Sequence, residues 1–416
     1  MEKSEWRVLR MKIEEILFEQ VTKENKDRLE ELKAKLNSQQ GNWMMCLGAG
    51  VSISVGLPNW YKLLAQISAR ILPSADCEIL VNNEQSKNYY EGVKKFYENL
   101  PENNTFWGKL EDAYKGGYKE TFSNINVLEA AEYVKNSLYR MSGYSEDNEK
   151  MQKGNLRKKV DAQMNFLIKQ ACSIDITEKD LKRKWGNSTL AAVAGLMRSK
   201  KFKDQLIHNV ITYNYDNLLE TYLRSVCKCN SKKVHSIIKK DELRDFGDNK
   251  EWNIYHVHGR IPVIPYDGEE MSDSVILAES DYYKEEQINY SWTNILQSYA
   301  ILRANLIFIG FSGSDYNFRR IIKYVNQENS ISQERYIFFS VDDIVQAVFT
   351  NEFKEGKKLE ECIDDMNGNN NSKYKFEKFF INYLIQAQTM YWEQHGLKVI
   401  WSSHEEIFTH LNSLHK

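Results

Sequence analysis

Short apolar runs alternate with longer amphipathic segments along most of the chain. The runs that we expect to form strands are residues 43–47, 206–212, 252–257, 306–309, 336–341 and 397–401. After the first run, apolar residues recur at helical spacing, at Trp60, Leu63, Leu64, Ile67 and Ile71. Because buried, non-alternating strands that are each followed by a helix are typical of a parallel sheet, the pattern predicts an α/β fold.

Strand-like runs are missing from a long segment near the middle of the chain. Between Cys77 and Gln205 the apolar residues have helical periodicity, in residues 126–141, 155–171 and 189–202. We therefore predict a helical insertion, residues 77–204, that forms a roof over a cleft. The sheet domain then comprises residues 41–76 and 205–416.

Each end of the chain has a helical pattern with two interpretations. Residues 1–40 form a predicted helical arm, which either packs back on the body as a surface helix or mediates oligomerisation or partner binding. The aromatic-rich helix expected from Tyr374 to Trp392 fits a core position or a subunit interface better than a base-stacking surface.

Composition excludes several classes of protein. The 416 residues contain 56 Lys and Arg against 58 Asp and Glu, so the net charge of -2 gives no global attraction to nucleic acid or anionic lipid. The six cysteines are scattered, which argues against a disulfide framework. The N-terminal residues lack the apolar core of a signal peptide, and no segment reaches the ~20 apolar residues of a membrane span. We expect a cytoplasmic protein.

A glycine-rich turn follows the first predicted strand, in Gly48 to Trp60 (GAGVSISVGLPNW). Strand, glycine turn and helix is the order of a dinucleotide site, where glycines let the backbone approach a pyrophosphate at a helix start. The third glycine of the usual fingerprint is absent. By itself the motif fits a nucleotide site or a plain tight turn.

Three further predicted strands end in polar motifs. These are ITYNYDNLLE (Ile211 to Glu220), YHVHGRIP (Tyr255 to Pro262) and FIGFSGSDYNFRRI (Phe308 to Ile321). In open parallel sheets the ligand crevice lies at the carboxyl ends of the strands. The four motifs together therefore predict one polar site at this edge.

The identity and order of these four motifs resemble the sirtuin-like NAD-hydrolase domain of prokaryotic anti-phage defence. Two auxiliary segments fit the same branch: ILAESDYY (Ile276 to Tyr283) and LEAAEYV (Leu128 to Val134). The resemblance covers roughly residues 43–324 and implies a Rossmann-like, NAD-binding sheet domain.

The chain departs from the deacylase sirtuins at their zinc ribbon. Those enzymes usually have two Cys-x-x-Cys pairs after the histidine motif, whereas this chain has no cysteine between Cys229 and Cys362 and has a polar loop at residues 265–274. We therefore expect no zinc, and the missing module argues against the acyl-lysine groove of those enzymes. The resemblance implies instead that NAD is the substrate and is hydrolysed to nicotinamide and ADP-ribose.

The resemblance also assigns roles to individual residues. Asn214 would hold the attacking water or a ribose hydroxyl, His258 would be the base, and Asp216 would orient Asn214 or the nicotinamide amide. A histidine with an ordinary pKa near ~6.5 can accept a proton at cytoplasmic pH. The pyrophosphate would be bound by Gly48, Ala49, Gly50 and Ser52. The nicotinamide side would be shaped by Pro58 and Trp60. The adenosine half would be bound by Gly310, Ser312, Asp315 and Asn317.

Each assignment has a structural alternative. Asn214, Asp216 and Asp315 could cap helices, because Asn and Asp are favoured there. Gly310 could simply form a turn at a strand end. We treat His256, two residues before the base candidate, as structural.

The predicted function is an NAD glycohydrolase effector that depletes NAD in anti-phage defence by abortive infection. Such an enzyme must be restrained at rest, so we expect activation by oligomerisation or by a partner, and the resemblance indicates a HerA-type ATPase. Two alternatives are a non-catalytic subunit that senses NAD or ADP-ribose, and a zinc-free NAD-dependent protein deacylase. We expect no membrane binding and no direct binding of nucleic acid.

Overall fold

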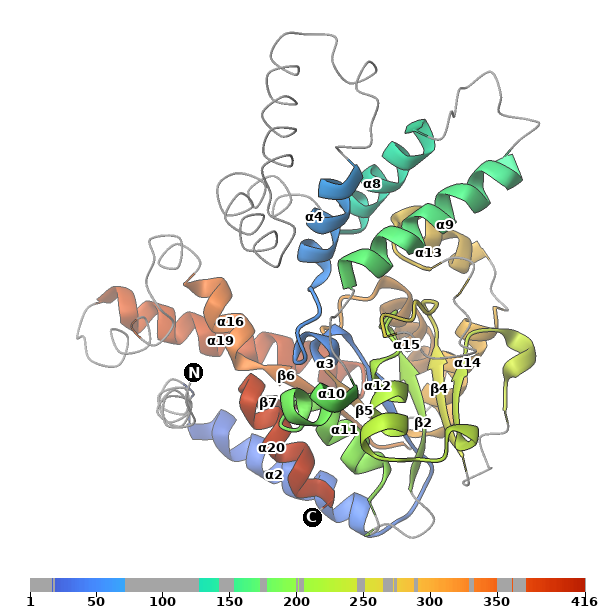
Figure 1. The fold of residues 1–416 in the computed structure, drawn as a ribbon. Coiled ribbons are helices and arrows are strands. Elements are labelled where there is room, and N and C mark those ends of the chain that lie inside the picture. Colours follow the sequence, from blue (N-terminus) through green and yellow to red (C-terminus); the bar gives the residue numbers. More distant parts are fainter. Residues whose placement is uncertain are drawn as a thin grey trace.

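The centre of the structure is a seven-stranded sheet whose pairings are all parallel (Figure 1). This computed structural model describes residues 17, 19–71, 127–141, 153–172, 178–199, 201, 206–244, 251–264, 272, 275–287, 291–328, 333–349, 361 and 372–415. Helices flank both faces of the sheet, so the predicted Rossmann-like α/β fold is confirmed.

The strands lie in the order β3-β4-β2-β1-β5-β6-β7. Their bounds are β1 Trp43–Leu47, β2 Ile207–Thr212, β3 Val234–Ile237, β4 Trp252–His256, β5 Asn305–Ile309, β6 Arg335–Ser340 and β7 Lys398–Ser402. The first strand is therefore central, between β2 and β5. Six of the seven match the predicted runs to within two residues, and only β3 was not predicted.

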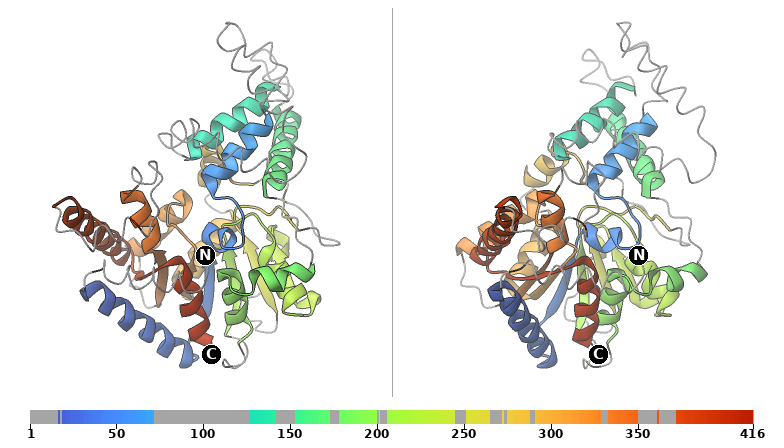
Figure 2. Two further views of the ribbon diagram at one scale, coloured as in Figure 1. Left: turned by 60° about the vertical axis from the view of Figure 1, so that its left-hand side comes forward. Right: turned by 90° about the vertical axis from the view of Figure 1, so that its left-hand side faces the viewer.

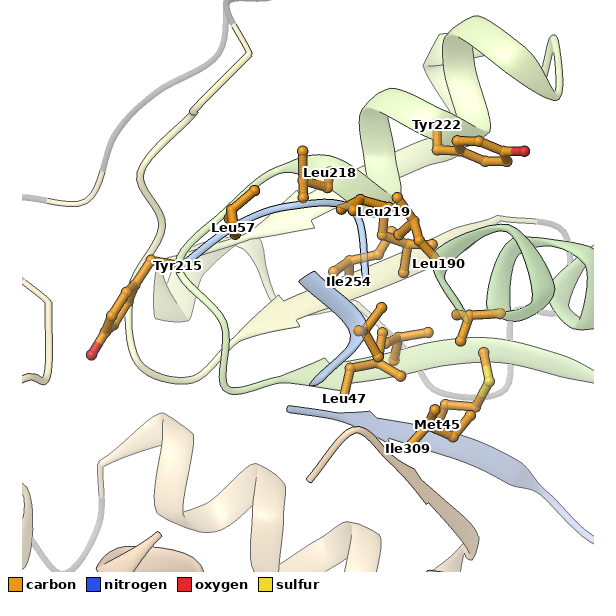
Figure 3. Packing of buried hydrophobic residues seen from close by; sticks show 14 of the residues in the cluster. Met45, Leu47, Leu57, Leu190, Tyr215, Leu218, Leu219, Tyr222, Ile254 and Ile309 are labelled. Carbon is orange, nitrogen blue, oxygen red and sulfur yellow. The ribbon is translucent and has the colours of Figure 1, made fainter. Parts of the chain in front are cut away.

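Alternate residues of β1 point to two separate cores. Met45 and Leu47 join the core under one helical layer, whereas Met44 and Cys46 join the core under the other. Figure 3 shows the first core from close by, where Met45 and Leu47 lie near Leu190, Leu218 and Leu219 of the covering helices. Helical cover on both faces explains why these strands are apolar without alternation.

The two helical layers come from different parts of the chain. The first contains α2 Glu19–Asn37, α11 Thr189–Met197, α12 Leu218–Thr221 and α20 His404–His415. The second contains α14 Trp292–Arg303, α15 Tyr316–Glu328, α16 Val341–Val348 and α19 Ser372–Gln394. A π-helical turn, Tyr222–Val226, extends α12, and short 3-10 turns cover Ser231–Lys233 and Lys240–Glu242. Each layer buries an apolar stripe against one face of the sheet.

A third group of helices lies apart from the two layers, at one end of the molecule (Figures 1 and 2). It consists of α4 Trp60–Ile71, α8 Val127–Met141 and α9 Lys153–Cys172, which pack on one another, and α8 also packs on α13 Glu279–Gln287. We call α4, α8 and α9 the helical cap. Residues 77–126 of the predicted insertion lie outside the described residues.

The predicted insertion contains helices of two kinds. Its later helices, α10 Glu178–Trp185 and α11, do not join the helical cap: α11 packs on β2 and α20, and α10 packs on the π-helical turn. The domain boundaries at residues 77 and 204 stay a prediction, and these contacts place α11 in a layer of the sheet.

The N-terminal helix α2 and the C-terminal helix α20 both pack on β7 of the sheet. Leu32 and Leu36 of α2 are fully buried, and Arg28 of α2 donates a hydrogen bond to the Val399 carbonyl of β7 at 2.7 Å. The described part of the predicted arm therefore packs back on the body, and residues 1–16 lie outside it.

The helix α19 has one buried and one exposed side. Ile381, Ile385 and Trp392 belong to the core, whereas Phe376 and Tyr383 are exposed. The buried side of α19 thus has the predicted core position. A subunit interface at its exposed side stays a prediction. None of the helices that the structure describes combines the length and apolar character needed to cross a bilayer.

Candidate active site

Four neighbouring strands bring the four polar motifs to one edge of the sheet. The last residues of these strands are aligned as partners across the sheet: Ile309 with Leu47, Leu47 with Thr212, and Thr212 with His256. The motifs that follow β5, β1, β2 and β4 therefore begin side by side. The central position of β1, which no spacing in the sequence reveals, makes this convergence possible.

The glycines of the β1 and β5 motifs allow two loops to touch through their backbones. The Gly50 amide donates to the Gly310 carbonyl at 2.9 Å, and the Gly48 amide donates to the Ile309 carbonyl at 3.0 Å. A Cβ atom on Gly48 or Gly50 would collide with the backbone at Gly310. Close approach of two loops is thus one reason for these glycines, and their contact with a pyrophosphate stays a prediction.

Substituting Gly310 tests this packing. Its φ of +63° disfavours any side chain, and a Cβ would lie 2.5 Å from the Val51 nitrogen. We expect Gly310→Ala to lower the free energy of unfolding by about 3 kcal/mol, measured by urea denaturation. Gly56 is the matched control because its φ is also positive, at +103°, but the surrounding space is open. Gly56→Ala should cost about 1–2 kcal/mol, and equal losses would contradict the packing argument.

Asn214 is held at the centre of the edge by the glycine loop. Its Nδ2 donates hydrogen bonds to the Gly48 carbonyl and to the Ser52 Oγ, both at 2.9 Å. The Ser52 hydroxyl in turn donates to Asp216 Oδ2 at 2.6 Å. Three predicted site residues from two motifs thus form one hydrogen-bonded chain, which fixes the direction of the Asn214 amide.

Asp216 combines an orienting contact with a capping contact. Its Oδ1 accepts a hydrogen bond from the Leu218 amide at 3.1 Å, at the start of α12, Leu218–Thr221. Burial raises the pKa of Asp216, although the Ser52 hydroxyl and the Leu218 amide act to lower it. The helix-cap alternative and the orienting role are therefore compatible in the same side chain.

His258 forms a buried pair with Asp315. The His258 Nε2 lies 3.2 Å from Asp315 Oδ2, and only 2% of the histidine is exposed. This is an electrostatic contact, because the Nε2–H direction does not meet the geometry of a hydrogen bond, and Nδ1 has no hydrogen-bond partner among the described residues. A buried ring nitrogen without a partner is available to a ligand.

The carboxylate of Asp315 stays ionised in this setting. Burial alone would raise its pKa, but His258, the Phe318 amide and the Tyr282 hydroxyl together bring the pKa below its ordinary value. The Phe318 amide donates to Asp315 Oδ1 at 2.7 Å, so Asp315 also caps α15. One carboxylate thus serves both the helix and the histidine.

His256 has a structural environment, as we expected. Its Nε2 lies 2.7 Å from Glu220 Oε1, and Arg260 approaches the same carboxylate at 3.5 Å. Each of these three residues is at most 2% exposed. Burial alone would raise the pKa of Glu220, but His256 and Arg260 lower it to about 2.

The remaining predicted site residues have diverse surroundings. Ala49 and Pro58 are half-buried, and the Trp60 ring meets the Tyr215 ring edge-on at 6.1 Å. Tyr215 points away from the core residues of Figure 3 and donates to the Ile276 carbonyl. Ser312 is exposed and bonds Ser314, whereas the buried Asn317 amide bonds Asn294 and Arg320. The contacts of Asn317 hold α15 on α14, and its role toward adenosine stays a prediction.

Two residues next to the site, Tyr282 and Glu220, were not predicted from the sequence. Tyr282 donates from its hydroxyl to Asp315 Oδ2 at 2.9 Å, and Glu220 Oε1 lies 2.7 Å from His256 Nε2. Tyr282 lies in the quoted ILAESDYY segment, so the segment was recognised without the residue that reaches the site. Glu220 is the last residue of the ITYNYDNLLE motif. A carboxylate is rarely buried without a partner, so its position close to predicted buried strands was the signal available in the sequence.

No metal site is visible in the part of the chain that the structure describes. No group of three or more His, Cys, Asp and Glu side chains there is arranged to hold a metal ion. Of the polar loop at residues 265–274, only Ser272 is described. Zinc independence therefore stays a prediction.

Comparison with known proteins identifies part of the chain. The family model of the SIR2-like domain matches residues 208–362, which is less than half of the 416 residues. The match runs from β2 to beyond α16 and includes the Asn214, His258 and Asp315 motifs, whereas β1 and its glycine turn precede it. No curated protein matches the chain. Because the SIR2-like family typically uses NAD, the match indicates a sirtuin-like domain with an NAD-related activity.

Proposed function

We propose that the protein is an NAD glycohydrolase that releases nicotinamide and ADP-ribose. The observation that carries this proposal is the convergence of the oriented Asn214 amide and the buried His258–Asp315 pair at one edge of the sheet, on the loops after β2, β4 and β5. Tyr213, next to Asn214 in the chain, contacts the His258 ring edge-on at 5.2 Å. In this proposal the Asn214 amide and the His258–Asp315 pair act on one substrate.

The reaction needs few contributions from side chains. The bond between the nicotinamide nitrogen and the ribose breaks through an oxocarbenium-like state, as in glycoside hydrolysis. Nicotinamide departs with the bonding electrons and becomes neutral, so no general acid is required. A water adds its oxygen to the ribose carbon and loses one proton. In this proposal Asn214 orients the water, His258 accepts the proton and Asp315 stabilises the resulting imidazolium.

The four loops would divide the substrate between them. In the proposed complex Gly48, Ala49, Gly50 and Ser52 contact the pyrophosphate, and Pro58 with Trp60 shapes the nicotinamide side. Gly310, Ser312 and Asn317 contact the adenosine half, whereas Asp315, which was predicted to join them, acts on His258. Crevices at the carboxyl ends of parallel strands commonly bind dinucleotides in this manner.

The test is nicotinamide release from NAD by the purified protein, with Asn214→Ala as the variant. Loss of the Asn214 amide removes the group that orients water, so we expect at least a 100-fold lower rate, measured by chromatography of the products. Asn412→Ala on α20 is the matched control and should retain the wild-type rate. Absence of nicotinamide release under every partner and oligomer condition would refute the proposal. Calorimetry then distinguishes a sensor, which binds NAD without turnover.

We also propose that the enzyme is an effector of anti-phage defence that acts by abortive infection. Unrestrained NAD hydrolysis would kill the host cell, so activity requires a trigger, which we assign to oligomerisation or to a HerA-type ATPase partner. Light scattering after size exclusion, with and without a co-expressed ATPase, measures the assembly. If the rate of nicotinamide release is the same in every assembly, this mode of activation is wrong.

A further inference from the structure

The Asp315 carboxylate is shared between two partners from different elements. Tyr282 of α13 donates its hydroxyl to Asp315 Oδ2 at 2.9 Å, and the same oxygen lies 3.2 Å from His258 Nε2. The rings of Tyr213 and Tyr282 contact the His258 ring edge-on, at centroid distances of 5.2 and 5.6 Å. Among the described residues, these are the titratable groups that contact His258: Tyr213 after β2, Tyr282 in α13 and Asp315 before α15.

The hydrogen bond from Tyr282 to Asp315 Oδ2 changes the electrostatic stabilisation of His258 in a predictable direction. A hydroxyl that donates to a carboxylate takes up part of its negative charge, so the carboxylate stabilises a neighbouring imidazolium less. Burial, followed by the Asp315 charge, raises the pKa of Tyr282 well above its ordinary value. The phenol therefore stays protonated and remains a donor at neutral pH.

The helix that carries Tyr282 is anchored to the helical cap. Asp281, the preceding residue, accepts a hydrogen bond from Lys135 Nζ of α8 at 2.6 Å, and Lys135 is also 3.1 Å from Asp161 of α9. Burial acts to lower the pKa of Lys135, but the two carboxylates outweigh it and raise the pKa. A second contact joins the same helices, because the Ser280 amide donates to Glu132 of α8 at 3.0 Å.

We propose that Tyr282 is a positioning residue that sets the basicity of His258 through their common Asp315 oxygen, and that the helical cap holds it there through α13. The consequence for the reaction rests on the proposed NAD hydrolysis, whereas the effect on His258 does not. The cap would then act on the chemistry without touching the substrate, since a displacement of α8 moves Tyr282 away from Asp315.

The direct test replaces Tyr282 with phenylalanine and follows the imidazole signals of His258 by NMR as the pH is varied. The His258 signals are assigned from their loss in His258→Gln. Without the hydroxyl, Asp315 interacts more strongly with His258, so its titration midpoint should rise by about half a pH unit or more. Tyr283→Phe is the matched control, because Tyr283 is the next residue, is 51% exposed and donates its hydroxyl to Glu279 on its own helix. Equal midpoints in the wild type and both variants would overturn the proposal.

A second pair of variants tests the link to the helical cap. Lys135→Met removes a positive charge near α13, and Glu132→Gln removes a negative charge from the same helix α8. Charge effects alone would move the His258 midpoint up in the first variant and down in the second. Displacement of Tyr282 moves it up in both. Opposite shifts therefore reject the link, and Glu132→Gln still decides the matter by its sign if Lys135→Met does not fold.

Kinetics add a readout that depends on the proposed function. In Tyr282→Phe the acidic limb of the pH profile for kcat should move upward by about half a pH unit, which lowers the kcat for nicotinamide release about 3-fold on that limb and leaves KM little changed. If the wild type has no activity, NAD hydrolysis is refuted while the NMR result still judges the role of Tyr282. An unaltered pH profile in an active Tyr282→Phe enzyme would contradict that role.

Discussion

Replacing His258 with glutamine should lower the rate of nicotinamide release at least 100-fold and leave NAD affinity almost unchanged. A positioned general base contributes typically 100- to 10,000-fold to a rate, and glutamine cannot accept the proton. The glutamine amide can still place an N–H near Asp315, which also keeps the Tyr282 hydroxyl and the Phe318 amide as partners. The measurements are nicotinamide release and calorimetric binding of NAD, with thermal unfolding to confirm the fold.

His404→Gln is the control for this substitution. His404 also pairs with a carboxylate, Asp343 at 3.1 Å, but both side chains are more than half exposed. The rate of nicotinamide release by His404→Gln should equal that of the wild type.

The lowered pKa of Asp315 bears on the pH dependence of the wild-type rate. This carboxylate remains charged in mildly acidic solution, so its own protonation cannot explain a loss of activity between about pH 5 and 7. A His258→Gln enzyme with wild-type turnover would refute the base assignment.

Replacing Glu220 with glutamine should produce the largest loss of stability, about 3–5 kcal/mol at neutral pH. The carboxylate is 1% exposed and is surrounded by His256, Arg260 and the Ser236 hydroxyl, which donates to it at 2.8 Å. Glutamine leaves two buried basic groups without their counter-charge. Urea denaturation at constant pH measures the loss.

The effect of Glu220 has a predictable pH dependence. In the unfolded chain its pKa is near the ordinary 4.5, and in the folded protein His256 and Arg260 overcome the cost of burial and lower the pKa to about 2. A lowered pKa stabilises the folded state above pH 4.5, and this stabilisation is lost as the pH falls from 4.5 toward 2. The difference between the wild type and Glu220→Gln should therefore shrink over this interval.

A surface pair gives the matched comparison. Glu251 lies 2.9 Å from His235 and 2.7 Å from Arg244, the same combination of side chains as around Glu220, but its side chain is 28% exposed. Glu251→Gln should cost less than about 1 kcal/mol, because exposed ion pairs contribute little. Equal losses in the two variants would show that burial is not the cause.

The sequence predicted six of the seven strands because buried strands of a parallel sheet are continuous apolar runs. It missed β3, which has only four residues, lies at the sheet edge and has a half-buried middle pair, His235 and Ser236. The order of the strands in the sheet could not be predicted from the sequence either. Contacts such as Ser52 with Asp216 join residues 164 positions apart, and only the alignment of β1 with β2 brings them together.

The site was predictable at the level of motifs and less so at the level of pairings. Strand-end polarity indicated Asn214, His258 and Asp315, since packing alone does not place polar residues there. It could not show that Asp315 faces His258, because the two follow strands that are separated by β2 and β1. Tyr282 was not predicted because a tyrosine in a helix is ordinarily a packing residue. The contact of its hydroxyl with Asp315 depends on how α13 is placed in the fold.

The central position of β1 has a consequence for synthesis of the chain. Its two neighbours are β2, which begins at Ile207, and β5, which begins at Asn305. At a translation rate of about 5–20 residues per second, roughly 8 to 30 seconds separate the appearance of β1 from that of β2. During that interval the apolar segment Trp43–Leu47 lacks both of the strands with which it pairs in the folded protein. We therefore expect the nascent chain to require protection by a chaperone until the second half of the protein emerges.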